Sequence, residues 1–509
     1  MFGSKLIIGS FWASMVVIFL GSCKIGNITG SRESAGSAES IALSGKFVSR
    51  ENLTPQYMQM SEKITTVADK YALSDLIREL KQNYDSYPPD LQFVAAFYIP
   101  MAKLQSIVYR LEGLFEKSQA GAARDKTTHS FYISLIKASA TGINTFLPNQ
   151  NWNTGFRYVT EPFKGADATN APFLRVKDFQ SYLMNSVLPE LENMYKSISK
   201  IQFAYGAEKP AQMPPEGFIV FDNKILYGTI VSNGKSVEPF PNNLDRYILV
   251  GEAERKAVLA SIKLSIHNLL VTCALNLDTI LDLNESLAKA LGFDNDLLGF
   301  REIEGLTSER RAKIVKDYAG KYKLFAVENP QLLQGAFANL KDAVNLAYEA
   351  WKMVKARKVE EVEATSDIAQ NFLGLNPARL IPWSRMTNAG FENLLNIVNN
   401  DKASVRSEVT GEVAEISLKN LYFNPPANLA DFMPTRFETQ REITEANMNY
   451  RNYFHGTPLE WNLATYINYF PSVQKTGGGG GGADVRSTAR IISQAWGGWF
   501  VSAPMILAL

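Results

Sequence analysis

The chain has two cysteines, and the first of them ends an apolar run near the N-terminus. Lys5 supplies a positive charge, Leu6–Leu20 is apolar, and Gly21 and Ser22 separate this run from Cys23. At 1.5 Å per residue such a run is about 22 Å long as a helix, short of the ~30 Å hydrocarbon core of a bilayer. The pattern is therefore typical of a cleaved export signal, not of a helix that spans a membrane.

The residues Leu20-Gly21-Ser22-Cys23 resemble the lipobox of bacterial lipoprotein precursors. The resemblance covers about the first 23 residues and implies thioether lipidation of Cys23, removal of residues 1–22, and acylation (palmitate) of the new N-terminus. Two or more acyl chains anchor a protein stably, at ~0.8 kcal/mol per buried CH₂. The alternative is an ordinary secretory signal followed by a chance cysteine.

Lys24 follows the predicted lipidated cysteine. In many Gram-negative lipoproteins an Asp at this position retains the protein at the inner membrane, so its absence implies transport to the outer membrane if the source is Gram-negative. We therefore expect a lipid-anchored protein of the cell envelope, at the outer membrane, facing the periplasm or the cell surface.

The second cysteine, Cys273, lies in the apolar stretch Leu269–Leu275. This setting predicts a buried, inert thiol, because a reactive thiol needs a neighbouring cation or a helix N-terminus to lower its pKa. Lys263 and His267 are the nearest groups that could act in this way. With Cys23 committed to lipid, no intrachain disulfide can form, and we expect stability to come from core burial.

Catalytic and metal-binding patterns are weak in this sequence. His129, His267 and His455 are far apart, and none has a histidine partner at i+3 or i+4, so we expect no metal centre and no cofactor. The chain has no G-x-S-x-G nucleophile elbow, and Gly477–Gly482 suits a flexible link better than a phosphate loop. A formal net charge of +1 without a basic block gives no reason to expect a nucleic-acid partner.

Two segments rich in Pro, Gly and Asn place a tryptophan among hydrogen-bonding side chains. They are Asn151-Trp152-Asn153 and Pro382-Trp383-Ser384-Arg385. A large ring beside amide and guanidinium groups suits carbohydrate, through stacking and directed hydrogen bonds. The alternative is that each tryptophan packs its loop onto the core. The candidate ligand-binding residues are thus Asn151, Trp152, Asn153, Trp383 and Arg385.

The elements that must position these residues are mainly helical, because apolar residues recur at spacings of 3 and 4 over much of the chain. We predict a mainly α fold, with a multi-helix body of packed antiparallel helices, a small inserted β-meander and a mixed C-terminal region. The predicted parts are a signal peptide (1–22), a flexible tether (23–52), a helical domain (53–365) with a β-insertion at about 217–250, a mixed region (366–476), and a Gly linker, final helix and apolar tail (477–509).

Local signals predict several helix ends. Thr54-Pro55 and Asn329-Pro330 each pair an N-cap with proline at the first helical position, and an apolar, core-facing stripe runs on from Leu333 to Val354. Pro100 should break or kink its helix. The stretch 252–290 is the most apolar one, and we expect it at the centre of the domain.

The C-terminal third carries mixed signals. Thr435…Glu438 and Thr457-Pro458-Leu459-Glu460 both fit the capping box, which predicts a helix start at each. Alternating residues over Glu408–Leu418 predict a strand or a hairpin around Gly411.

Three functions remain open. The first is a non-enzymatic, lipid-anchored protein that binds a ligand or acts as a scaffold in the envelope. The second is narrower: length, helical character and lipidation are loosely similar to SusD-type glycan-binding lipoproteins. The third is an envelope hydrolase that brings one of the scattered histidines to a carboxylate. The expected partners are the membrane, through the N-terminal lipid, and a glycan or an envelope protein.

Overall fold

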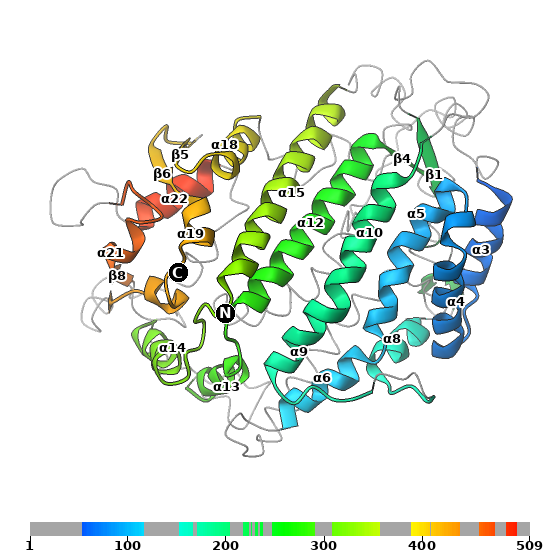
Figure 1. The fold of residues 1–509 in the computed structure, drawn as a ribbon, viewed down its shortest axis with the longest axis horizontal. Coiled ribbons are helices and arrows are strands. Elements are labelled where there is room, and N and C mark those ends of the chain that lie inside the picture. The colour runs from blue at the N-terminus through cyan, green and yellow to red at the C-terminus, as the bar shows by residue number, and fades with distance from the viewer. Residues whose placement is uncertain are drawn as a thin grey trace.

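Helices that lie side by side make up most of the described part of the molecule (Figure 1). The computed structural model describes residues 53–116, 152–165, 170–203, 217–222, 225, 230–232, 235–237, 247–290, 308–356, 388–407, 409–437, 458–473 and 485–495. The predicted signal peptide and tether (1–52), the boundary predicted between 365 and 366, and the Gly linker lie outside these ranges.

The mainly α fold class is confirmed. The short segments η2 (Tyr84–Ser86), η3 (Ile99–Leu104) and η6 (Leu183–Val187) connect neighbouring helices. The described α-helices up to residue 356 are α3 (Pro55–Thr65), α4 (Lys70–Gln82), α5 (Pro89–Tyr98), α6 (Ile107–Glu116), α8 (Trp152–Thr160), α9 (Val176–Tyr182), α10 (Leu188–Lys200), α12 (Glu252–Ala274), α13 (Ile280–Ala290), α14 (Ser308–Tyr322) and α15 (Pro330–Ala356).

Helices α5, α10, α12 and α15 lie next to one another in that order, with α3 and α4 beyond α5 (Figure 1). Arg255, near the start of α12, donates to the carbonyl of Ile201 just beyond α10 at 2.7 Å, so these two helices run antiparallel. The central position predicted for the most apolar stretch is confirmed for α12. The stretch is two helices, because the backbone leaves the helical path between Leu275 and Thr279.

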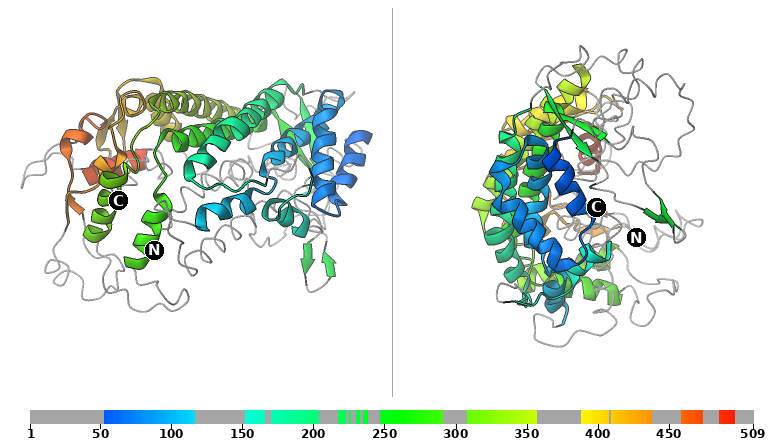
Figure 2. Two further views of the ribbon diagram at one scale, coloured as in Figure 1. Left: turned by 60° about the horizontal axis from the view of Figure 1, so that its bottom comes forward. Right: turned by 90° about the vertical axis from the view of Figure 1, so that its right-hand side faces the viewer.

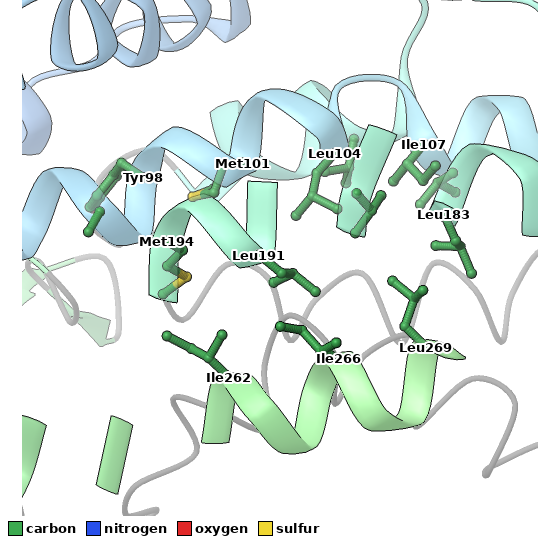
Figure 3. Packing of buried hydrophobic residues seen from close by; sticks show 14 of the residues in the cluster. Tyr98, Met101, Leu104, Ile107, Leu183, Leu191, Met194, Ile262, Ile266 and Leu269 are labelled. Carbon is green, nitrogen blue, oxygen red and sulfur yellow. The ribbon is translucent and has the colours of Figure 1, made fainter. Parts of the chain in front are cut away.

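Three helical segments meet in the core of this body (Figure 3). Met101 points inward from η3 and Leu191 from α10, while Ile262 and Ile266 of α12 approach from the opposite side. All four side chains are buried. The 3₁₀ segment η3 contains Pro100, which has no N–H for the helical ladder, so the predicted break is confirmed.

Helix α3 begins as predicted. Thr54 is the N-cap of α3, where its hydroxyl accepts the Tyr57 N–H at 3.2 Å, and Pro55 occupies the first helical position. Asp90, at the start of α5, accepts the Thr54 backbone N–H at 3.1 Å and the Thr54 hydroxyl at 3.0 Å. Burial raises the pKa of the Asp90 carboxyl. These hydrogen bonds join the starts of two helices.

A segment before α9 crosses α6 at short range. Gly113 permits the crossing, because a Cβ there would lie 2.7 Å from Pro172 Cβ and 2.8 Å from Phe173 O. Arg110 secures it: the side chain is 7% exposed, donates from Nε to Ala171 O at 3.0 Å, and stacks 4.1 Å from the Phe173 ring. Burial lowers the pKa of Arg110.

The β-insertion lies where it was predicted, but its strand order is not that of a meander. β1 (Phe218–Asp222) pairs antiparallel with β4 (Tyr247–Gly251), while β2 (Ile230–Ser232) and β3 (Lys235–Val237) form a separate hairpin that projects from the body (Figure 2). The meander is therefore wrong. The core helices select the observed pair, since β1 packs on α5 and β4 runs directly into α12.

Helices α12 and α15 pack antiparallel along their length. Lys256 near the start of α12 pairs with Glu349 near the end of α15, and Lys263 pairs with Asp342 at 2.9 Å. A Cβ on Gly335 would lie 3.5 Å from Leu270, which is ordinary contact. The ion pairs lie at the partly exposed rim of the seam, and the seam itself is apolar.

Small side chains line this seam. Ala253 and Ala257 of α12 form a buried cluster with Ala350 of α15. Ala336, Ala343 and Ala350 recur every seven residues and are all buried, so they share one face of α15. Alanine on both helices lets the two axes approach closely. Within the predicted Leu333–Val354 stripe, Phe337, Val344 and Trp351 contact the C-terminal region.

The C-terminal region has its own apolar cluster, which includes Phe432, Tyr466 and Phe470. The predicted hairpin around Gly411 is confirmed, and Gly411 has a φ of 72°. The elements of this region are α18 (Asn388–Asn399), β5 (Ala403–Arg406), β6 (Val413–Ile416), α19 (Leu418–Phe423), η9 (Leu429–Phe432), β7 (Arg436–Phe437), β8 (Pro458–Glu460), α21 (Leu463–Tyr466) and α22 (Val485–Ala495).

The two helix starts predicted from the capping boxes of this region are wrong. Residues 436–437 and 458–460 are the paired strands β7 and β8, and α21 begins only at Leu463. The Thr435 N–H donates to Glu460 O at 2.8 Å, and Arg436 pairs with the Glu460 carboxylate at 2.9 Å. Glu460, which was expected to cap a helix, thus contacts the paired strand through its carbonyl and its carboxylate.

In the described part of the chain, residues Pro89–Phe115 and α12 are long and apolar enough to cross a membrane by composition alone. Most of each stretch is buried against other helices, which accounts for its apolar character as core.

We predict that Gly113→Ala lowers the free energy of unfolding by about 1–3 kcal/mol, because the new methyl group collides with the backbone of the crossing segment. Gly320→Ala is the matched control. It adds a methyl group to α14 with nothing within 4 Å, and should raise stability by up to ~1 kcal/mol. Urea unfolding of both variants checks this; equal effects would contradict the tight crossing.

Candidate functional site

The sequence-predicted site residues fall mostly outside the described ranges. Cys23, Asn151, Trp383 and Arg385 are among these. The backbone of Trp152 and Asn153 is described, and it forms the first turn of α8 where a loop was predicted. The helix is held from its other end, where Tyr158 is buried and its carbonyl accepts the Ser106 N–H at 2.9 Å.

His267 is buried where α12, α15 and α19 meet. Its Nδ1 lies 3.0 Å from Ala336 O and must donate, because a carbonyl oxygen can only accept. Nε2 then carries the lone pair and accepts a long hydrogen bond, 3.5 Å, from the Tyr422 hydroxyl. Burial lowers the pKa of His267 to about 4 and raises the pKa of Tyr422. Both groups are therefore neutral at pH 7.

The partners of His267 bear on the hydrolase hypothesis, which needs a histidine within hydrogen-bond reach of a carboxylate. His267 bonds to a backbone carbonyl and a phenol instead. It acts as a neutral link between the body and the C-terminal region. His129 and His455 lie outside the described residues.

Cys273 is the free cysteine of the described residues. Its Sγ lies 3.6 Å from the backbone oxygen of Gln180, and burial raises the thiol pKa to about 12. The raised pKa agrees with the predicted inert thiol, because a protonated thiol is a poor nucleophile. The residue is half-buried, where full burial was predicted. Gln180 in turn donates its side-chain amide to Thr272 O and Leu275 O at 2.7 and 2.9 Å, which caps the end of α12.

A surface with polar and apolar side chains lies at the C-terminal ends of α19 and α21. We call Asn420, Phe423, Asn424, Ile467 and Asn468 the amide surface. The Asn424 amide donates to Asn420 Oδ1 at 2.7 Å, and the Asn420 amide donates to Asn468 O at 3.0 Å. Phe423 and Ile467 are 40% and 52% exposed. The surface therefore combines neutral hydrogen-bonding groups with exposed apolar side chains.

Sequence reasoning missed the amide surface. A local signal was present: Asn420 and Asn424 are four residues apart, which places them on one side of a helix. Asn468 is 48 residues from Asn420, and only the tertiary packing brings them together.

Within the residues that the structure describes, no group of three or more His, Cys, Asp or Glu side chains is placed to hold a metal ion. No family model matches the chain, and no curated protein or solved structure matches it either. The functional inference therefore rests on the residues and contacts of this chain.

We predict that the fold loses stability as the pH falls, because it buries His267 in the neutral form. The ordinary histidine pKa of 6.5 drops to about 4 in the fold. Between these values the unfolded chain binds the proton and the folded chain does not, so stability is lost as pH falls. The loss attributable to His267 is about 3 kcal/mol.

His267→Gln isolates this contribution, because glutamine can still donate to Ala336 O but does not titrate. The free energy of unfolding is measured by urea at pH 7 and pH 4. H267Q should lose about 3 kcal/mol less than the unmodified chain over this interval. An identical loss in both proteins would show that folding does not lower the pKa of His267.

Proposed function

We propose that this chain is a lipid-anchored, non-enzymatic protein of the cell envelope, with a binding or scaffold role, held at the outer membrane through Cys23. The observation that carries the proposal is the pattern Leu20-Gly21-Ser22-Cys23 directly after the apolar run Leu6–Leu20. The acyl chains that the lipobox resemblance implies would anchor a water-soluble body stably.

The contacts of the buried polar groups support binding over catalysis. His267, Arg110, Asp90 and Cys273 each contact a backbone group or side chain of another segment. Their hydrogen bonds stabilise the fold, so the polar groups of these side chains are engaged within the protein. For the residues that the structure describes, these contacts are compatible with recognition through the exposed surface.

The test is metabolic labelling with a palmitate analogue, followed by membrane fractionation and mass analysis of the mature N-terminus. The unmodified chain should carry the label, begin at Cys23 and partition with detergent. Cys23→Ala should lose the label and remain uncleaved at this site. Cys273→Ser is the matched control, since it removes the other cysteine and should keep the label.

Label on Cys23→Ala, or a mature unmodified chain that retains residues 1–22, would overturn the proposal.

A further inference from the structure

Two exposed amides of the amide surface keep unused hydrogen-bonding capacity. Asn424 Nδ2 donates to Asn420, and Asn468 Nδ2 donates to Ala464 O at 3.2 Å. Within the described residues neither side-chain oxygen accepts a hydrogen bond, and each Nδ2 has a second N–H. A carboxamide presents a donor and an acceptor side by side, which matches the N–H and C=O groups of a peptide backbone.

The apolar members favour a peptide over a sugar. The Phe423 ring is fixed by an edge-on contact with Phe337, with centroids 6.0 Å apart, and so is only partly open for stacking. Ile467 is the more exposed of the two and is aliphatic. An exposed aliphatic side chain beside amides suits the alternating side chains of an extended, apolar peptide.

Residues 500–509 of the same chain have this chemistry. The segment Phe-Val-Ser-Ala-Pro-Met-Ile-Leu-Ala-Leu contains no charged side chain. Its apolar side chains favour removal from water, and its backbone groups need hydrogen-bond partners wherever they are buried.

The geometry allows the segment to reach the amide surface. Helix α22 ends at Ala495, whose carbonyl accepts the Asn393 amide of α18 at 2.8 Å. Helix α18 also packs against α19, which carries Asn420 and Phe423. Helix α18 spans about 18 Å, whereas residues 496–509 can extend over ~46 Å. The segment is therefore long enough to cross α18 and reach α19.

We propose that the amide surface binds residues 500–509 of its own chain in an extended conformation. The apolar side chains lie against Phe423 and Ile467, and the backbone forms hydrogen bonds with Asn424 and Asn468. This inference is independent of the lipid anchor.

Disulfide trapping in the full-length chain tests the proposal. Ile467→Cys with Leu507→Cys forms the test pair. Val413→Cys with Leu507→Cys is the matched control, because Val413 is 47% exposed on the β5–β6 hairpin. Both pairs carry Cys23→Ala, which removes the other native thiol outside the fold's core. Cys273 stays silent because burial raises its pKa. We expect the test pair to form an intrachain disulfide at least ten times faster than the control pair.

A third substitution in the test pair separates binding from chance collision. Asn424→Ala, at an exposed position, should slow trapping about five-fold. Asn400→Ala removes a similar exposed amide just beyond the end of α18 and should leave the rate unchanged. Equal rates for the two cysteine pairs, or no effect of Asn424→Ala, would overturn the proposal. A product of doubled mass would also overturn it, because the occupant would then be a second copy.

Discussion

The close antiparallel packing of α12 against α15 is the interaction on which the rest of the structure depends. Alanine on both helices brings the axes together, and ion pairs seal the rim of the seam. The other side of α12 packs on α10, and the other side of α15 carries α18 and α19 (Figure 1). One helix pair therefore supports both apolar clusters, and His267 spans the seam to reach Tyr422.

The ends of the same helix pair are joined by backbone hydrogen bonds. Beyond α12, Asn276 exchanges hydrogen bonds with Ala326 and Phe325 at 2.9 and 2.8 Å, and the Leu429 N–H donates to Phe325 O at 3.1 Å. Lys323 and Phe325 adopt φ values of 53° and 64° to make the tight turn. Segments before α15 and before η9 thus meet at the end of α12. This junction ties the C-terminal region to the body by main-chain contacts as well as by side chains.

The sequence predicted the helical elements well where the signal was local and strong. The Thr54-Pro55 cap, the break at Pro100 and the hairpin at Gly411 depend on backbone preferences of a few adjacent residues. The capping boxes at Thr435 and Thr457 failed because the same residues pair with a distant strand, so tertiary contacts override local preference. The meander failed for the same reason.

The candidate site residues also divide into those with a local sequence signal and those that only the tertiary packing brings together. A lipobox is a short contiguous motif, so the sequence alone suffices to predict Cys23 as a lipid site. The tryptophan segments were selected by composition. Composition did not predict that the backbone at Trp152 is helical, as it is in α8. The amide surface joins residues at the C-terminal ends of α19 and α21 and depends on packing around Phe432 and Tyr469. Such a surface cannot be found without the fold.

Native-state hydrogen exchange of the full-length chain across a denaturant series tests most directly whether α12 and α15 hold both clusters together. We predict that peptides from these two helices exchange slowest. Peptides from α10 and from α18–α22 should then lose protection at the same denaturant concentration, because both clusters rest on the one helix pair. Loss of protection in α18–α22 well before α15 would contradict this account and would show that the C-terminal region folds as a separate unit.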